Sequence, residues 1–111
     1  MKEEKLADFR EQLLLLRERT QAAADMAQSA TATVELDQTR QGRLSRMDAL
    51  QGQQMALERE RRRKAQLTRI EGALRRIESG DFGFCFVCEE EIDLRRLEAD
   101  PTLTRCTECA E

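Results

Sequence analysis

The chain has 111 residues, of which 37% are charged and only 4% are aromatic, and its formal net charge is −3. This length accommodates one ordinary domain, and so few large apolar side chains argue against a single globular core. A pair of long helices tolerates the composition, because each helix needs only a narrow apolar stripe. Disorder of the helical part is the competing interpretation for a charge-rich chain.

The sequence contains no candidate for membrane insertion or export. The longest aliphatic run, Leu13 to Leu16, falls far short of the ~20 apolar residues of a membrane span. Acidic residues occupy the N-terminal region, where a signal peptide needs net positive charge before an apolar core. We therefore expect a cytoplasmic protein, and in a reducing cytosol paired Cys-x2-Cys motifs favour a metal over disulfides.

Residues 3–28 are predicted to form a first helix. Its apolar and small residues recur at three- and four-residue steps, which places them on one face; they are Leu6, Phe9, Leu13, Leu16, Thr20, Ala23 and Ala27. Residues 29–37 are rich in Ser, Thr and β-branched residues, which are weaker helix formers, so we expect the chain to reverse there. Asp37 is then a plausible N-cap of the next helix.

Residues 38–78 are predicted to form a second, longer helix, which makes residues 1–78 an antiparallel coiled-coil hairpin. One apolar stripe contains Leu44, Met47, Leu50, Gln54 and Leu57, and another contains Leu67, Ile70, Leu74 and Ile77. If the chain turns near residue 34, the first helix is too short to reach the second stripe. That stripe is therefore expected to pack on residues 79–111.

Residues 79–111 are predicted to form a small separate domain. Gly80 suits the left-handed conformation that ends many helices. Alternation of Phe82, Phe84 and Phe86 suggests a short strand, and Leu94 to Ala99 is predicted to form a short helix or turn ended by Asp100-Pro101. Together with the hairpin, this gives an all-α fold with a small C-terminal four-cysteine zinc finger.

The four cysteines lie in two pairs, Cys85-x2-Cys88 and Cys106-x2-Cys109. Two such pairs at this separation converge on one tetrahedral zinc ion. Four protein ligands leave no open position for a substrate water, so we expect one structural Zn²⁺. The chain has no histidine, and we expect a binding protein and not an enzyme. Free thiols or a redox pair are the alternative.

Charge is distributed unevenly along the chain. Residues 1–79 hold 16 Lys and Arg residues and 13 Asp and Glu residues, whereas residues 80–111 hold 3 and 9, so the zinc finger is acidic. The run from Arg59 to Lys64 is basic, but no aromatic residue is interleaved for base stacking. We therefore favour an acidic protein surface or a small anion as its partner over direct binding to DNA.

The residues around the cysteines also occur in a specific order. It reads Ile70-Glu71-x-Ala73-Leu74-x-Arg76-Ile77-Glu78-x-Gly80-Asp81-Phe82-Gly83-x-Cys85-x2-Cys88, followed by Ile92, Arg95-Arg96-Leu97-Glu98-Ala99, Pro101 and Cys106-x2-Cys109. Through this order, and through residues 34–38 and 42–50, residues 33–109 resemble the DksA/TraR zinc-finger family of bacteria. The chain departs from it where Glu89 replaces the usual glycine, where the tip lacks an Asp-x2-Asp-x-Ala pattern, and at Ala110, where ppGpp-responsive members are basic.

The resemblance implies a transcription regulator that binds RNA polymerase directly. In that family the coiled-coil tip enters the secondary channel and changes promoter-complex stability, and some members act with ppGpp in the stringent response. The candidate tip residues here are Glu35, Asp37, Arg43, Arg46 and Asp48. Arg62 and Arg69 match basic positions that help bind ppGpp. The alternatives are a coiled-coil and zinc-finger adaptor between other proteins, and a zinc-ribbon nucleic-acid binder.

Overall fold

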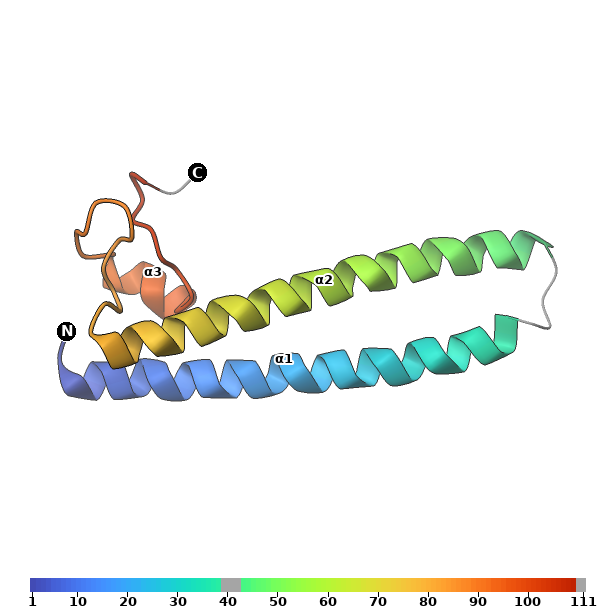
Figure 1. The fold of residues 1–111 in the computed structure, drawn as a ribbon, viewed down its shortest axis with the longest axis horizontal. Helices are drawn as coiled ribbons and strands as arrows, with labels where there is room; N and C mark the ends of the chain where they lie inside the picture. Colours follow the sequence, from blue (N-terminus) through green and yellow to red (C-terminus); the bar gives the residue numbers. More distant parts are fainter. Residues whose placement is uncertain (39–42, 110–111) are drawn as a thin grey trace. The chain divides into compact units, whose positions relative to one another are not determined.

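The computed structural model describes the backbone of residues 1–38 and 43–109, and the side chains of residues 1–29 and 46–109. Its helices are α1 (Glu3–Gln38), α2 (Arg43–Ser79) and α3 (Leu94–Ala99) (Figure 1). The described residues form no strand, and only an isolated antiparallel bridge joins Phe84 to Glu91. The prediction of an all-α fold with a compact cysteine-bearing C-terminal part is confirmed.

The predicted turn over residues 29–37 is wrong, because these residues continue α1 as far as Gln38. Ser, Thr and Val each cost only a few tenths of a kcal/mol relative to alanine, and the segment contains neither Gly nor Pro. Asp37 lies inside α1, so it is not the N-cap of α2, which begins at Arg43. Residues 39–42, between the two helices, lie outside the described part.

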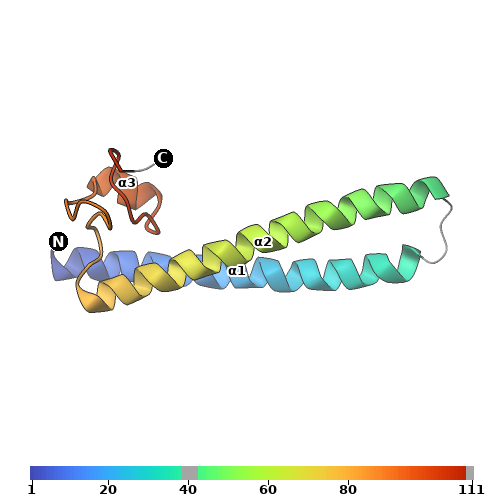
Figure 2. The same cartoon turned by 45° about the horizontal axis from the view of Figure 1, so that its top comes forward.

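The chain divides into two compact units. Their boundaries differ from the predicted single boundary after residue 78. Unit 1 combines Met1–Glu18 with Thr68–Glu111, and unit 2 is Arg19–Leu67. Within each unit, the α1 and α2 segments run side by side in opposite directions, as both views show (Figure 1, Figure 2). The zinc finger therefore shares a unit with the beginning of α1 and the end of α2, because they share a core.

The core of unit 1 is built from three segments. Phe9 and Leu13 of α1 meet Ile70 and Ala73 of α2 and a set of buried finger residues, which are Phe82, Cys85, Ile92 and Leu97. The rings of Phe9 and Phe82 lie 5.2 Å apart between centroids. The expectation that the stripe around Ile70 lacks a partner in the first helix is therefore wrong. Since α1 ends ten residues later than predicted, its Phe9 and Leu13 lie opposite that stripe.

Polar contacts link α1 to the rest of unit 1. The Lys5 ammonium lies 2.9 Å from a Glu98 carboxylate oxygen, and Arg17 lies 3.0 Å from Glu71. Gln12 donates to the backbone carbonyl of Glu98 at 3.3 Å. All of these side chains are exposed or half-exposed, so each pair contributes at most about 1 kcal/mol. They fix the direction of α1 more than they stabilise it, and burial of the apolar core supplies most of the packing energy.

Unit 2 is packed differently, since none of its described side chains is fully buried. Its half-buried positions include Ala24 and Ala27 of α1 and Ala49 and Ala56 of α2, together with longer side chains such as Arg63 and Leu67. The predicted stripe of Met47, Leu50 and Leu57 is wrong as a helix–helix contact, because these side chains are 61%, 59% and 54% exposed. In unit 2 these four alanines are therefore more covered than Met47, Leu50 and Leu57.

Candidate metal centre

The zinc finger begins directly after Ser79, the last residue of α2. Gly80 has φ +84°, as its predicted role as a C-terminal cap requires, and the N–H groups of Asp81 and Phe82 donate back to the carbonyl of Arg76 at 2.9 and 3.1 Å. The Arg76 guanidinium also donates to the carbonyls of Asp81 and Phe84. This role of Arg76 is not predicted above, although a basic residue in the last helical turn is a common partner of free carbonyls.

A tight loop at residues 85–90, here called the zinc knuckle, presents the first cysteine pair. Cys85 N–H donates to the Glu90 carbonyl at 2.8 Å, and Glu89 N–H donates to the Cys85 carbonyl at 3.0 Å. Next to this loop, Ile92 N–H donates to the Gly83 carbonyl at 2.8 Å. Gly83 has φ +89°. The predicted strand at Phe82 to Phe86 is therefore reduced to one bridge, because the chain turns at the cysteines.

Helix α3 positions the second cysteine pair. Its N-cap is Asp93, whose side chain accepts from Arg95 N–H at 3.1 Å, and the buried Leu97 anchors it to the core. The helix spans the predicted residues 94–99. Asp100 then orders the turn that follows, because its carboxylate accepts from both the N–H and the hydroxyl of Thr102. This returns the chain to Cys106, and Cys109 N–H donates to the Cys106 carbonyl at 3.2 Å.

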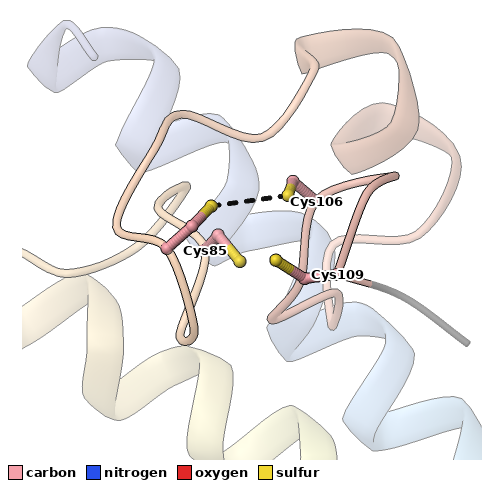
Figure 3. A group of neighbouring side chains, drawn as sticks. Cys85, Cys106 and Cys109 are labelled. Carbon is pink, nitrogen blue, oxygen red and sulfur yellow. Dashed lines mark hydrogen bonds between the residues drawn. The ribbon is translucent and has the colours of Figure 1, made fainter.

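The four cysteine sulfurs all lie within 4.8 Å of one another, and those of Cys88 and Cys106 are 3.5 Å apart. Figure 3 shows the sulfurs of Cys85, Cys106 and Cys109 directed toward a common centre. A tetrahedral zinc ion with Zn–S bonds of about 2.3 Å requires sulfurs roughly 3.8 Å apart. The cluster therefore fits one Zn²⁺ with four thiolate ligands, as the spacing of the two pairs predicts.

The electrostatics of the cluster also favour a cation. The backbone N–H of Cys88 is the main cause that lowers the pKa of Cys85 to about 6, against the effect of burial. The neighbouring Cys106 side chain is the main cause that raises the pKa of Cys109 to about 12. Cys85 therefore loses its proton readily, whereas the neighbouring cysteine side chains oppose a negative charge on Cys109. A divalent ion removes this repulsion, because it stabilises all four thiolates at once.

Glu89, directly after the second cysteine of the knuckle, has φ +63°. A side chain in the left-handed region costs roughly 1–2 kcal/mol, whereas glycine takes it without this penalty. Glu89→Gly should therefore stabilise the zinc-loaded finger by about 1 kcal/mol, measured as a higher melting temperature at unchanged zinc content. Glu90→Gly is the control, since Glu90 is also exposed but does not have positive φ. A Glu89→Gly protein that melts at or below the wild-type temperature would contradict the prediction.

The other predicted site residues do not gather at the metal centre. The side chains of Glu35, Asp37 and Arg43 lie outside the described residues, and Arg46 and Asp48 are exposed on α2. Arg62, in unit 2, is exposed, and its Nε lies 3.5 Å from a carboxylate oxygen of Glu58. Arg69, in unit 1, is also exposed. Within the described part of the chain, no helix is long and apolar enough to cross a bilayer.

The two antiparallel helix segments, the short α3 and the four converging cysteines define a helical protein with a C4-type zinc finger. Residues 80–111 match the prokaryotic dksA/traR C4-type zinc finger. Over 96% of its length the chain superimposes on 80% of the transcription factor DksA2 from Pseudomonas aeruginosa, with a TM-score of 0.85 and 31% identity. The chain belongs to the DksA/TraR family.

Sequence relatives agree with this assignment. An RNA polymerase-binding transcription factor DksA from Caulobacter vibrioides is 36% identical over 110 residues, which are 99% of this chain and 66% of that protein. The protein of the same name from Haemophilus influenzae is 44% identical over 64 residues, or 55% of this chain. Only 43% of the Haemophilus protein is matched, so the matched region spans less than half the length of that relative.

Proposed function

We propose that this chain regulates transcription by binding RNA polymerase directly. The observation that carries the proposal is the superposition on a DksA2 transcription factor over nearly the whole chain. The relatives from Caulobacter and Haemophilus, both named as RNA polymerase-binding factors, support it. In this proposal the protein acts in the cytoplasm by binding alone, without catalysing a reaction, and the zinc finger is structural.

We further propose that the end of unit 2 nearest residues 39–42 enters the secondary channel of polymerase and changes promoter-complex stability. The exposed side chains of Arg46 and Asp48 at the beginning of α2 support this assignment, since they are available to a partner. Met47 and Leu50 beside them are also exposed, although they are apolar. A surface that combines exposed apolar and charged side chains suits a protein partner.

Binding to purified core polymerase tests the proposal. The zinc-loaded chain should bind it and should compete with a factor known to occupy the secondary channel. A photo-crosslinker at residue 36 should attach to channel residues. Binding without competition would favour the adaptor hypothesis, in which the zinc finger docks elsewhere. No binding to core polymerase would overturn the proposed function.

The acidic tip residues should be needed for the effect on promoter complexes. The triple variant Glu35→Gln, Asp37→Asn, Asp48→Asn removes three negative charges with little change in side-chain size. We expect its effect on promoter-complex lifetime to fall by about tenfold, since a loss of roughly 1.4 kcal/mol corresponds to that factor. Filter binding after a competitor challenge measures the lifetime. Glu11→Gln, at an exposed position in unit 1, is the control, and an unchanged lifetime in the triple variant would reject the tip assignment.

We propose ppGpp as a co-regulator, held in part by Arg62 and Arg69. Guanidinium groups suit phosphates because they donate hydrogen bonds in pairs. If ppGpp strengthens the effect of the wild-type protein, Arg62→Ala and Arg69→Ala should reduce that response several-fold without changing basal binding to polymerase. In vitro transcription with and without ppGpp provides the measurement. Arg59→Ala is the control, and a ppGpp response that persists in both variants would exclude these residues.

A further inference from the structure

Two large apolar side chains at the zinc knuckle are directed into solvent. Phe86 and Val87, between the first two cysteines, are 76% and 59% exposed. Phe82, four residues earlier, is 3% exposed in the core of unit 1. Regular alternation would place these two phenylalanines on the same side. The turn at Cys85 instead directs Phe86 away from the core.

The exposure of Phe86 does not arise from a loosely held loop. Its N–H donates to the Thr104 carbonyl at 2.7 Å, and Val87 N–H donates to the Cys85 sulfur at 3.4 Å. The hydrogen bonds between Cys85, Glu89 and Glu90 close the loop on the other side. The backbone therefore presents both side chains in a fixed direction. A rigid aromatic residue loses little conformational entropy on binding, which is a common property of interface hot spots.

The charges beside the pair select the kind of partner. Glu89, Glu90 and Glu91 follow the second cysteine directly, and all three are exposed. One zinc ion with four thiolates adds about two further negative charges. The acidic residues follow the pair in the chain and form what is here called the acidic flank, and Arg105 follows Thr104, whose carbonyl accepts from Phe86 N–H. This flank repels phosphates, which argues against nucleic acid, and a two-fold contact with a second copy would place like charges together.

We propose that the zinc knuckle is a second contact of this chain with RNA polymerase, in which Phe86 and Val87 enter an apolar recess on a basic protein surface. The inference rests on the proposed function, and it assigns to the zinc finger a part in binding besides its structural one. Apolar burial supplies affinity at this contact. The acidic flank supplies orientation and a dependence on salt.

The test compares dissociation constants of full-length, zinc-loaded variants for purified core polymerase. Phe86→Ser should weaken binding by about tenfold or more, as the loss of a central aromatic contact typically does. Leu15→Gln is the matched control, since Leu15 is an apolar side chain of unit 1 that is 53% exposed; it should change the affinity by less than about twofold. Zinc content and circular dichroism are measured for each variant. If Phe86→Ser loses zinc, Val87→Ser takes its place.

Two further measurements address the partner's chemistry. The double variant Glu89→Gln, Glu90→Gln should reduce the salt dependence of the affinity, because it removes two charges from the flank. A photo-reactive phenylalanine analogue at position 86 should crosslink to a peptide rich in Lys and Arg. Wild-type binding with no loss in Phe86→Ser, or an equal loss in Leu15→Gln, would overturn the knuckle contact alone. Absence of wild-type binding would overturn the proposed function and the knuckle contact with it.

Discussion

Cys85→Ser should lower the zinc affinity by more than the ~10–100-fold that is typical of a lost outer-shell partner, and it should unfold the finger. Cys85 is 2% exposed, it belongs to the core of unit 1, and its sulfur accepts from Val87 N–H. A serine hydroxyl does not replace a thiolate ligand. Because binding of the metal supplies much of the folding free energy of so small a module, loss of zinc and loss of structure should occur together.

Zinc content of the purified protein and resistance of residues 80–109 to proteolysis measure the effect. Glu108→Gln is the control, since Glu108 lies between two of the cysteines but is exposed and its carboxylate is not a ligand in this assignment. Removal of zinc from the wild-type protein with a chelator should reproduce the proteolysis pattern of Cys85→Ser, and added zinc should reverse it. A Cys85→Ser protein with one tightly bound zinc would exclude the four-thiolate site.

Leu13→Ala should reduce the free energy of unfolding by about 2–5 kcal/mol, the usual cost of a large-to-small change in a packed core. Leu13 has no exposed surface, and it belongs to the cluster that joins α1, α2 and the finger. Truncation leaves a cavity beside residues from all three segments, and neighbouring side chains fill it only partly.

Leu15→Ala provides a matched comparison, since Leu15 lies two residues away on the same helix but is 53% exposed. Its cost should stay within about 0.5 kcal/mol. Chemical denaturation followed by circular dichroism gives both values, provided that the slope with denaturant is unchanged. Equal costs at the two positions would contradict the assigned core of unit 1.

The metal site was predictable because its ligands are close in sequence. Each Cys-x2-Cys pair forms within one tight turn, and the helix between the pairs, Leu94–Ala99, is limited by its N-cap Asp93 and by Asp100-Pro101. Gly80 was predicted to take the left-handed backbone that ends a helix, and its φ is positive. Short-range chemistry determines such features, so little of the surrounding fold is needed to predict them.

The extent of α1 was not predictable in the same way. Helix propensities over residues 29–37 differ by only a few tenths of a kcal/mol per residue, which is too little to end a helix when no Gly or Pro is present. A reversal of the chain at residues 29–37, as predicted, would leave Ile70 without its partners in α1. Contacts such as those of Phe9 and Leu13 with Ile70 depend on the register of two helices over the whole length of unit 1.

The residues alone were enough to predict the all-α class, the convergence of the four cysteines, a helix or turn at residues 94–99 and the family, because local spacing and turn chemistry carry that information. Tertiary packing decided where α1 ends, that the finger shares a core with Phe9 and Leu13, that Met47 and Leu50 are exposed, and that Phe86 is directed into solvent. In these cases the apolar pattern shows which residues favour burial. It does not show how many of them the available partner surfaces can cover, since that depends on how the segments meet in three dimensions.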